Sequence, residues 1–138
     1  MRIDGACHCG NISFVLETAQ PRETLVPRAC DCSFCRMHAA QCFSDPQGSV
    51  AIDVRDGALL QIYRFAEQTA DFLVCRRCGA YAGAMITQGD VKRATLNLRL
   101  TELRDVPARS VSYAGETRDR RMARRLARWT PADLLIRG

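Results

Sequence analysis

Seven of the eight cysteines stand in three tight clusters, and this spacing constrains the fold more than any other feature of the chain. The clusters are Cys7-His8-Cys9, Cys30-Asp31-Cys32-Ser33-Phe34-Cys35 and Cys75-Arg76-Arg77-Cys78. CxC and CxxC pairs are too close in the chain to staple distant segments as disulfides, but they match the ligand spacing of zinc sites. We therefore predict two metal sites, one with four thiolate ligands and one with three.

The length and composition favour a single domain that spans residues 1–138. A chain of 138 residues can bury a core without disulfide bonds. It contains no run of about eighteen apolar residues, and its first residues lack the basic and hydrophobic regions of a signal peptide. Because a reducing compartment keeps thiols available for metal, we expect a cytoplasmic protein with no membrane partner.

The formal net charge of +5 is a weak argument for a nucleic-acid partner. A divalent ion bound by four thiolates leaves a net charge of −2, and one bound by three leaves −1. When all seven clustered thiols ionise around two ions, the charge falls from +5 to about +2. The metal-loaded protein is then only mildly basic.

Short runs of alternating apolar residues predict a mainly β fold. In the first run, Ile12, Phe14 and Leu16 share one face of a strand. Gly5 and Gly10 flank the first cysteine pair, where we expect the backbone to turn closely around an ion. The pair Asp56-Gly57 predicts a β-hairpin between the runs 49–53 and 58–65. Further strands are predicted over 24–26, 41–43, 69–74, 80–86, 91–100 and 111–113.

The hydrophobic period becomes helical between Thr117 and Trp129. Met122, Leu126 and Trp129 lie at helical spacing, Thr117 can cap the helix, and Pro131 limits it. We predict a short C-terminal helix whose basic face is solvated more often than it reads nucleic acid. That face carries Arg118, Arg121, Arg125 and Arg128.

The spacing leaves two interpretations open for Cys30, Cys32 and Cys35. A fourth ligand from His38, Cys42 or His8 would close a purely structural site, whereas a site without one keeps a position for water or substrate, as catalytic zinc does. Cys42 lies in a predicted strand, which favours a core thiol over a ligand. His38 is expected to be a proton shuttle or a solvated loop residue. Arg36, next to the cluster, is a candidate to offset thiolate charge.

Three motifs follow one another in the chain: Gly5-x-Cys7-x-Cys9-Gly10-x-Ile12-x-Phe14, Cys30-x-Cys32-x-x-Cys35-Arg36 and Phe72-x-x-Cys75-x-x-Cys78-Gly79. Their order and spacing resemble those of the glutathione-dependent formaldehyde-activating enzymes and the related centromere protein V domain. The resemblance covers about residues 5–100, and residues 101–138 with the arginine-rich helix form an extension outside it. It implies antiparallel sheets in a tent-like arrangement that carries two zinc ions per chain.

The resemblance also implies an activity and a role for each metal. The activity is that of a carbon–sulfur lyase acting on the adduct of glutathione, or of another thiol, with an aldehyde such as formaldehyde. No glutathione-binding residue can be carried over to this sequence. The alternative is a non-catalytic, zinc-stabilised module that contacts nucleic acid or a protein through the arginine-rich helix. The implied ligands are Cys7, Cys9, Cys75 and Cys78 for a structural zinc, and Cys30, Cys32 and Cys35 for a catalytic zinc.

Overall fold

A computed structural model describes residues 1–138 and confirms the mainly β fold with a helix toward the C-terminus. No helix in it is long and apolar enough to span a bilayer. The helices are α1 (Ser33–Met37) and α2 (Arg118–Arg128), with short 3-10 turns at Arg22–Thr24, Gly57–Leu59 and Leu98–Leu100. The strands are β1 (Arg2–Ala6), β2 (Ile12–Glu17), β3 (Arg28–Cys30), β4 (Cys42–Phe43), β5 (Ser49–Val54), β6 (Leu60–Tyr63), β7 (Asp71–Cys75), β8 (Tyr81–Gln88), β9 (Val91–Asn97), β10 (Arg109–Val111) and β11 (Thr130–Ile136).

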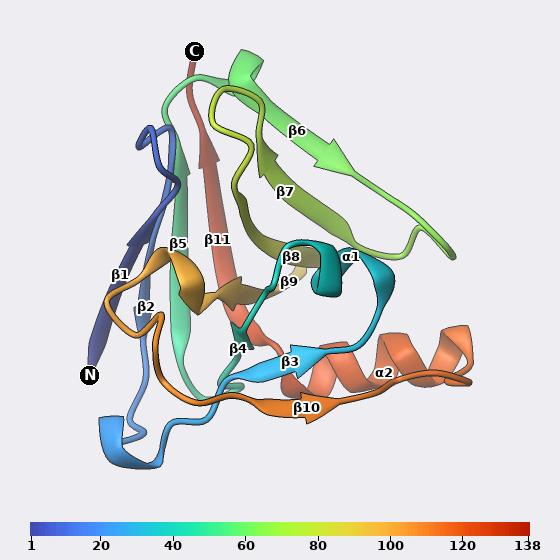
Figure 1. The fold of residues 1–138 in the computed structure, drawn as a ribbon. Coiled ribbons are helices and arrows are strands. Elements are labelled where there is room, and N and C mark those ends of the chain that lie inside the picture. Colours follow the sequence, from blue (N-terminus) through green and yellow to red (C-terminus); the bar gives the residue numbers. More distant parts are fainter.

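The strands form two groups that meet where β11 contacts β9. One group has the order β1-β2-β5-β11, and the other has the order β6-β7-β8-β9-β4-β3-β10. Thr130 and Pro131 pair with β9, whereas residues 132–136 pair with β5. In Figure 1, β6 and β7 lie close to β5 and β11 near the C-terminus and slope away from them at their other ends, which gives the tent-like arrangement. Most pairings are antiparallel, but β3 with β10 and β5 with β11 are parallel, so the sheet is mixed.

The main core lies between these two groups of strands. Ile12, Phe14 and Leu16 are buried on one face of β2, as the alternation predicts. Gly5 pairs with Phe14 across β1 and β2, and a Cβ atom at Gly5 would overlap the phenyl ring. Its role is therefore close packing and not a turn around an ion. Gly10 does make the turn, with a φ of 85° that favours glycine.

The predicted hairpin at Asp56-Gly57 is wrong. Strand β5 pairs with β2 and β11, whereas β6 pairs with β7 in the other group of strands. The Asp56 carboxylate accepts a hydrogen bond from the Ala58 amide at 2.9 Å and caps a 3-10 turn. The tight turn exists, but the chain uses it to pass from one group of strands to the other.

One other local prediction also fails, while the helix is confirmed. The run 24–26 is not a strand. Helix α2 ends at Arg128, before Pro131 as predicted, and the chain continues at Thr130 into β11, which was not predicted. A proline is tolerated near the start of a strand, where its missing N–H costs no ladder bond. Thr117 caps α2 as predicted, since its hydroxyl accepts from the Arg120 amide at 3.2 Å. Trp129 is buried directly after the helix.

Candidate metal centres and the adjoining cavity

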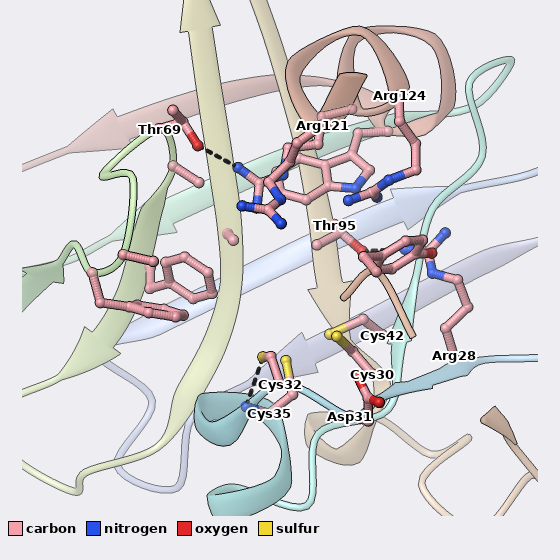
Figure 2. Close-up of a pocket in the computed structure, with 18 of the residues that line it drawn as sticks. Arg28, Cys30, Asp31, Cys32, Cys35, Cys42, Thr69, Thr95, Arg121 and Arg124 are labelled. Carbon is pink, nitrogen blue, oxygen red and sulfur yellow. Dashed lines mark hydrogen bonds between the residues drawn. The ribbon is translucent and has the colours of Figure 1, made fainter. Parts of the chain in front are cut away.

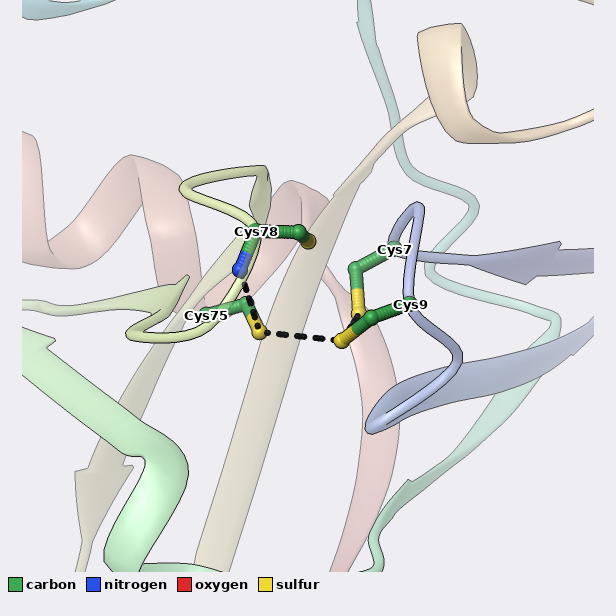
Figure 3. Close-up of side chains that lie close together, drawn as sticks. All are labelled: Cys7, Cys9, Cys75 and Cys78. Carbon is green, nitrogen blue, oxygen red and sulfur yellow. Dashed lines mark hydrogen bonds between the residues drawn. The ribbon is translucent and has the colours of Figure 1, made fainter.

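Cys7, Cys9, Cys75 and Cys78 converge from two turns that are far apart in the chain (Figure 3). Their four Sγ atoms lie within 4.8 Å of one another. The Sγ atom of Cys9 lies 3.7 Å from that of Cys7 and 3.5 Å from that of Cys75. Sulfurs placed tetrahedrally at about 2.3 Å from a zinc ion would be about 3.8 Å apart. The four-thiol cluster could therefore hold a metal ion, and its dimensions fit zinc.

The two turns have the same local construction. The Gly10 amide donates to the Cys7 carbonyl at 3.0 Å, and the Gly79 amide donates to the Cys75 carbonyl at 2.9 Å. Backbone amides also point at sulfur, from Ile12 to Cys7 at 3.2 Å and from Cys78 to Cys75 at 3.5 Å. Such N–H groups stabilise the thiolate relative to the thiol, and the thiolate is the form that binds a metal ion.

Cys30, Cys32 and Cys35 form the second cluster, with Sγ atoms within 4.8 Å of one another. Cys30 ends β3, Cys32 is the N-cap of α1, and Cys35 lies in the first turn of that helix. The Cys35 amide donates to the Cys32 sulfur at 3.4 Å. Strand β10 supports the cluster from outside, because Val111 pairs with Cys30. The Cys32 cap starts the helix at Ser33.

Without a cation, the two clusters do not favour the thiolate form of all their cysteines. Burial raises the pKa of the Cys7 thiol to about 12. Hydrogen bonds from Cys30 and Cys35 lower the pKa of Cys32, while the same contacts raise the pKa values of Cys30 and Cys35. One thiolate is thus favoured in the three-thiol cluster and its neighbours keep their protons. A divalent ion removes this restriction, because its charge favours all the thiolates together.

None of the three candidates for a fourth ligand joins Cys30, Cys32 and Cys35 within that 4.8 Å radius. His38 has its Nδ1 atom 2.9 Å from the Phe34 carbonyl oxygen, and its ring packs on the Phe34 ring. His8 is exposed beside the other cluster. Cys42 is buried near the thiols, and burial raises the pKa of its thiol to about 11. It is the core residue that its strand predicts.

A cavity of about 370 Å³ opens beside the three-thiol cluster, and 13 of its 20 lining residues are hydrophobic. The three cysteines lie at one end, while Thr69, Arg121 and Arg124 lie at the other (Figure 2). This volume is within the range of sites for small molecules. The aromatic part of the wall consists of Phe65, Phe72, Tyr81, Tyr113 and Trp129.

Helix α2 turns part of its basic face toward this cavity, which differs from the solvated face predicted for it. Arg124 contacts Glu116 at 2.9 Å and places its guanidinium 3.5 Å from the centre of the Tyr113 ring. Arg121 pairs with Glu116 at 3.3 Å and also with Glu67. The exposed arginines of the helix are Arg118, Arg120 and Arg128, and those that line the cavity are Arg121, Arg124 and Arg125.

The thiol spacing predicted all seven clustered sulfurs but not the cavity wall. Arg28 lines the cavity and donates to Ser44 at 2.7 Å and to Thr95 at 2.9 Å. Arg36, which we expected near the thiolate charge, is exposed and is not among the lining residues. Thr95 of β9 also lines the cavity. No local pattern marked Arg28 or Thr69.

Glu116 anchors α2, and its replacement by glutamine tests that role. The hydrogen bond from Arg124 lowers the pKa of Glu116. A lowered folded-state pKa contributes stability that is present above the ordinary value of about 4.3 and is lost as pH falls through the folded value. We expect Glu116→Gln to reduce the free energy of unfolding by about 1–2 kcal/mol at pH 7.

Urea unfolding of the native protein and Glu116→Gln at a series of pH values measures this difference. It should shrink as the pH falls below about 4, since protonation removes the same charge from the native protein. A difference that stays constant over the whole acid range would contradict the anchoring role.

The chain was compared with known proteins. No family model matches it, and no curated protein matches it. The crystal structure of a Rhodobacter sphaeroides protein, a structural-genomics target, is 30% identical with a TM-score of 0.51, over 72% of this chain and 87% of that chain. The two chains belong to one family. The description of this relative states no activity or ligand, so the function is argued from the site.

Proposed function

We propose that the protein is a zinc-dependent enzyme of the carbon–sulfur lyase type. Its substrate would be the adduct of a thiol with an aldehyde such as formaldehyde, and glutathione is the thiol that the motif resemblance implies. The observation that supports this proposal is the placement of Cys30, Cys32 and Cys35 at one end of a cavity, in a cluster that does not include His8, His38 or Cys42. A purely structural site needs four ligands and no cavity.

The two clusters would hold zinc for different purposes. The four-thiol cluster has a complete ligand set and would hold a structural ion. The three-thiol cluster would hold the catalytic ion, since a position remains for a ligand from the cavity. When bound there, zinc supplies a positive charge that lowers the pKa of a thiol beside it and polarises an aldehyde oxygen.

The lining residues suit the addition of a thiol to an aldehyde. In that reaction the S–H bond breaks, the sulfur bonds to the aldehyde carbon, and the proton ends on the former carbonyl oxygen. Asp31 is the one carboxylate among the lining residues and can take up and return this proton. Phe72, Tyr81 and Trp129 make an apolar wall that limits water around the aldehyde. Cleavage of the carbon–sulfur bond is the reverse of these steps.

A rate measurement tests the proposal. We expect zinc-loaded protein to accelerate the exchange between free formaldehyde and its glutathione adduct by at least about 100-fold over the uncatalysed reaction. Exchange NMR with labelled formaldehyde, over a range of pH, measures this rate. Metal-free protein is the control. The absence of any acceleration at every pH would overturn this substrate pair.

The alternative of a module that binds nucleic acid or protein through α2 has less support. Arg121 and Arg125, two of the arginines that suggested it, line the cavity. The cytoplasmic location also stays a prediction.

A further inference from the structure

Four arginines line the cavity, and they differ in how their charges are neutralised. Arg121 and Arg124 form ion pairs with Glu116. Arg28 donates to the hydroxyls of Ser44 and Thr95 and has no carboxylate partner. The remaining arginine, Arg125, also has no carboxylate partner. Two cationic groups in the wall therefore lack a counter-ion.

Arg125 is the less satisfied of the two. Its Nη1 atom donates to the Thr69 hydroxyl at 2.9 Å, but its Nε atom is buried and has no hydrogen-bond partner. Burial, followed by the charges of Arg124 and Arg121, lowers the pKa of Arg125 to about 10, so the group is still charged at neutral pH. The guanidinium also lies 5.0 Å from the centre of the Trp129 ring, but no counter-ion neutralises it. A buried charge without a counter-ion is costly, and an anion at this position would offset the cost.

The position of Arg28 has an explanation that does not apply to Arg125. Arg28 pairs with Cys42 across β3 and β4, and it lies on the same short strand as Cys30 of the three-thiol cluster. Arg28 is thus placed to offset thiolate charge. Thr69, which holds Arg125, lies at the end of the cavity away from Cys30 and Cys32 (Figure 2). Arg125 is therefore the cation that is available for a ligand.

We propose that the substrate carries a carboxylate that binds Arg125, while its reacting sulfur or carbon lies at the three-thiol end. The reacting end rests on the proposed function, but the carboxylate site rests on Arg125 alone. Its Nη2 atom has no protein partner, so an N–H group of the guanidinium is left for a carboxylate oxygen from the cavity. The mostly hydrophobic lining suits a small organic acid better than a multiply charged phosphate.

Paired thiol probes test the inference. In protein loaded with cobalt in place of zinc, thiol binding is followed by the sulfur-to-cobalt absorption band. We expect 3-mercaptopropionate to bind about 10- to 100-fold more tightly than 3-mercaptopropanol, because a hydrogen-bonded charge pair contributes this much. In Arg125→Gln, the ratio of the affinity for 3-mercaptopropionate to that for 3-mercaptopropanol should fall to about one. The affinity for the neutral thiol should stay the same.

Two further variants make this result specific. Arg128→Gln removes an exposed arginine of the same helix and should keep the native ratio. Thr69→Val removes the hydroxyl that orients Arg125 and should reduce the ratio in part, which also tests the site if Arg125→Gln does not fold. Thermal unfolding of metal-loaded Arg125→Gln should be no lower than that of the native protein, because the variant removes an unpaired buried charge.

The outcomes separate this inference from the proposed function. A ratio near one in the native protein, with both thiols bound, overturns the carboxylate site and leaves the proposed function standing. If neither thiol binds, the proposed function fails at the metal, and propionate alone is then added to the native protein and Arg125→Gln. A rise in melting temperature on adding propionate, in the native protein but not in Arg125→Gln, would support the carboxylate site. The absence of a shift, or a shift with inorganic phosphate but not with propionate, would overturn it.

Discussion

Cys75→Ser is expected to lose one of two bound metal ions and to lower the melting temperature by about 15 °C. The cluster joins turns that are 66 residues apart and that belong to different groups of strands. Because such a site does not exist in the unfolded chain, the binding free energy of its metal is folding free energy. A loss of about 4 kcal/mol corresponds to a shift of this size in a chain of this length.

Metal analysis and thermal unfolding of the same samples measure both effects. Cys42→Ser is the matched control, since Cys42 is 7% exposed, Cys75 is 1% exposed, and Cys42 belongs to neither cluster. Cys42→Ser should keep two ions, and its free energy of unfolding should fall by only about 1–2 kcal/mol. If Cys75→Ser keeps two ions, or melts together with Cys42→Ser, the four-thiol cluster does not hold the fold together.

Cys32→Ala is expected to abolish activity while the fold survives. It should bind one ion in place of two, and its rate of adduct formation should fall by at least about 100-fold, to that of the uncatalysed reaction, since the electrostatic stabilisation disappears with the ion. The cluster lies between β3 and a helix of five residues, and β10 holds Cys30 through the backbone. The melting temperature of Cys32→Ala should therefore fall much less than that of Cys75→Ser.

Two variants control this experiment. His38→Ala should keep both ions and most of the activity, because His38 contacts Phe34 and does not line the cavity. Cys42→Ser should keep both ions. Loss of the second ion from either variant would show that the three-thiol site has a fourth protein ligand, and the site would then be structural. Full activity in Cys32→Ala would remove the catalytic role altogether.

Features of the fold that depend on local spacing could be predicted from the sequence. The clustered cysteines are separated by two or three positions along the chain, so the seven thiols can be recognised without knowing the fold. Helix α2 and its Thr117 cap are local in the same sense. The Asp56-Gly57 turn is also local, but which strands pair on either side of it is decided by contacts across the molecule. Sequence spacing therefore predicted the turn and failed on the hairpin.

The cavity wall was not predictable for the same physical reason. The arginines of α2 alternate in a way that fits a solvated face equally well. Their direction is set by Glu116 and by the burial of Trp129, and neither contact is visible in the helix pattern alone. Arg28 comes into the cavity through pairing of β3 with β4, which brings it beside Ser44 and Thr95. These contacts join residues up to 67 positions apart.

The two ends of the cavity come from separate stretches of the chain. The thiols come from residues 30–35 and the cationic end from residues 121–129, so evolution can alter one without altering the other. Relatives that keep the three thiols but replace Arg125 would then perform the same reaction on molecules of different charge. The residue at the position of Arg125, and not the cysteine pattern, should sort such relatives by substrate.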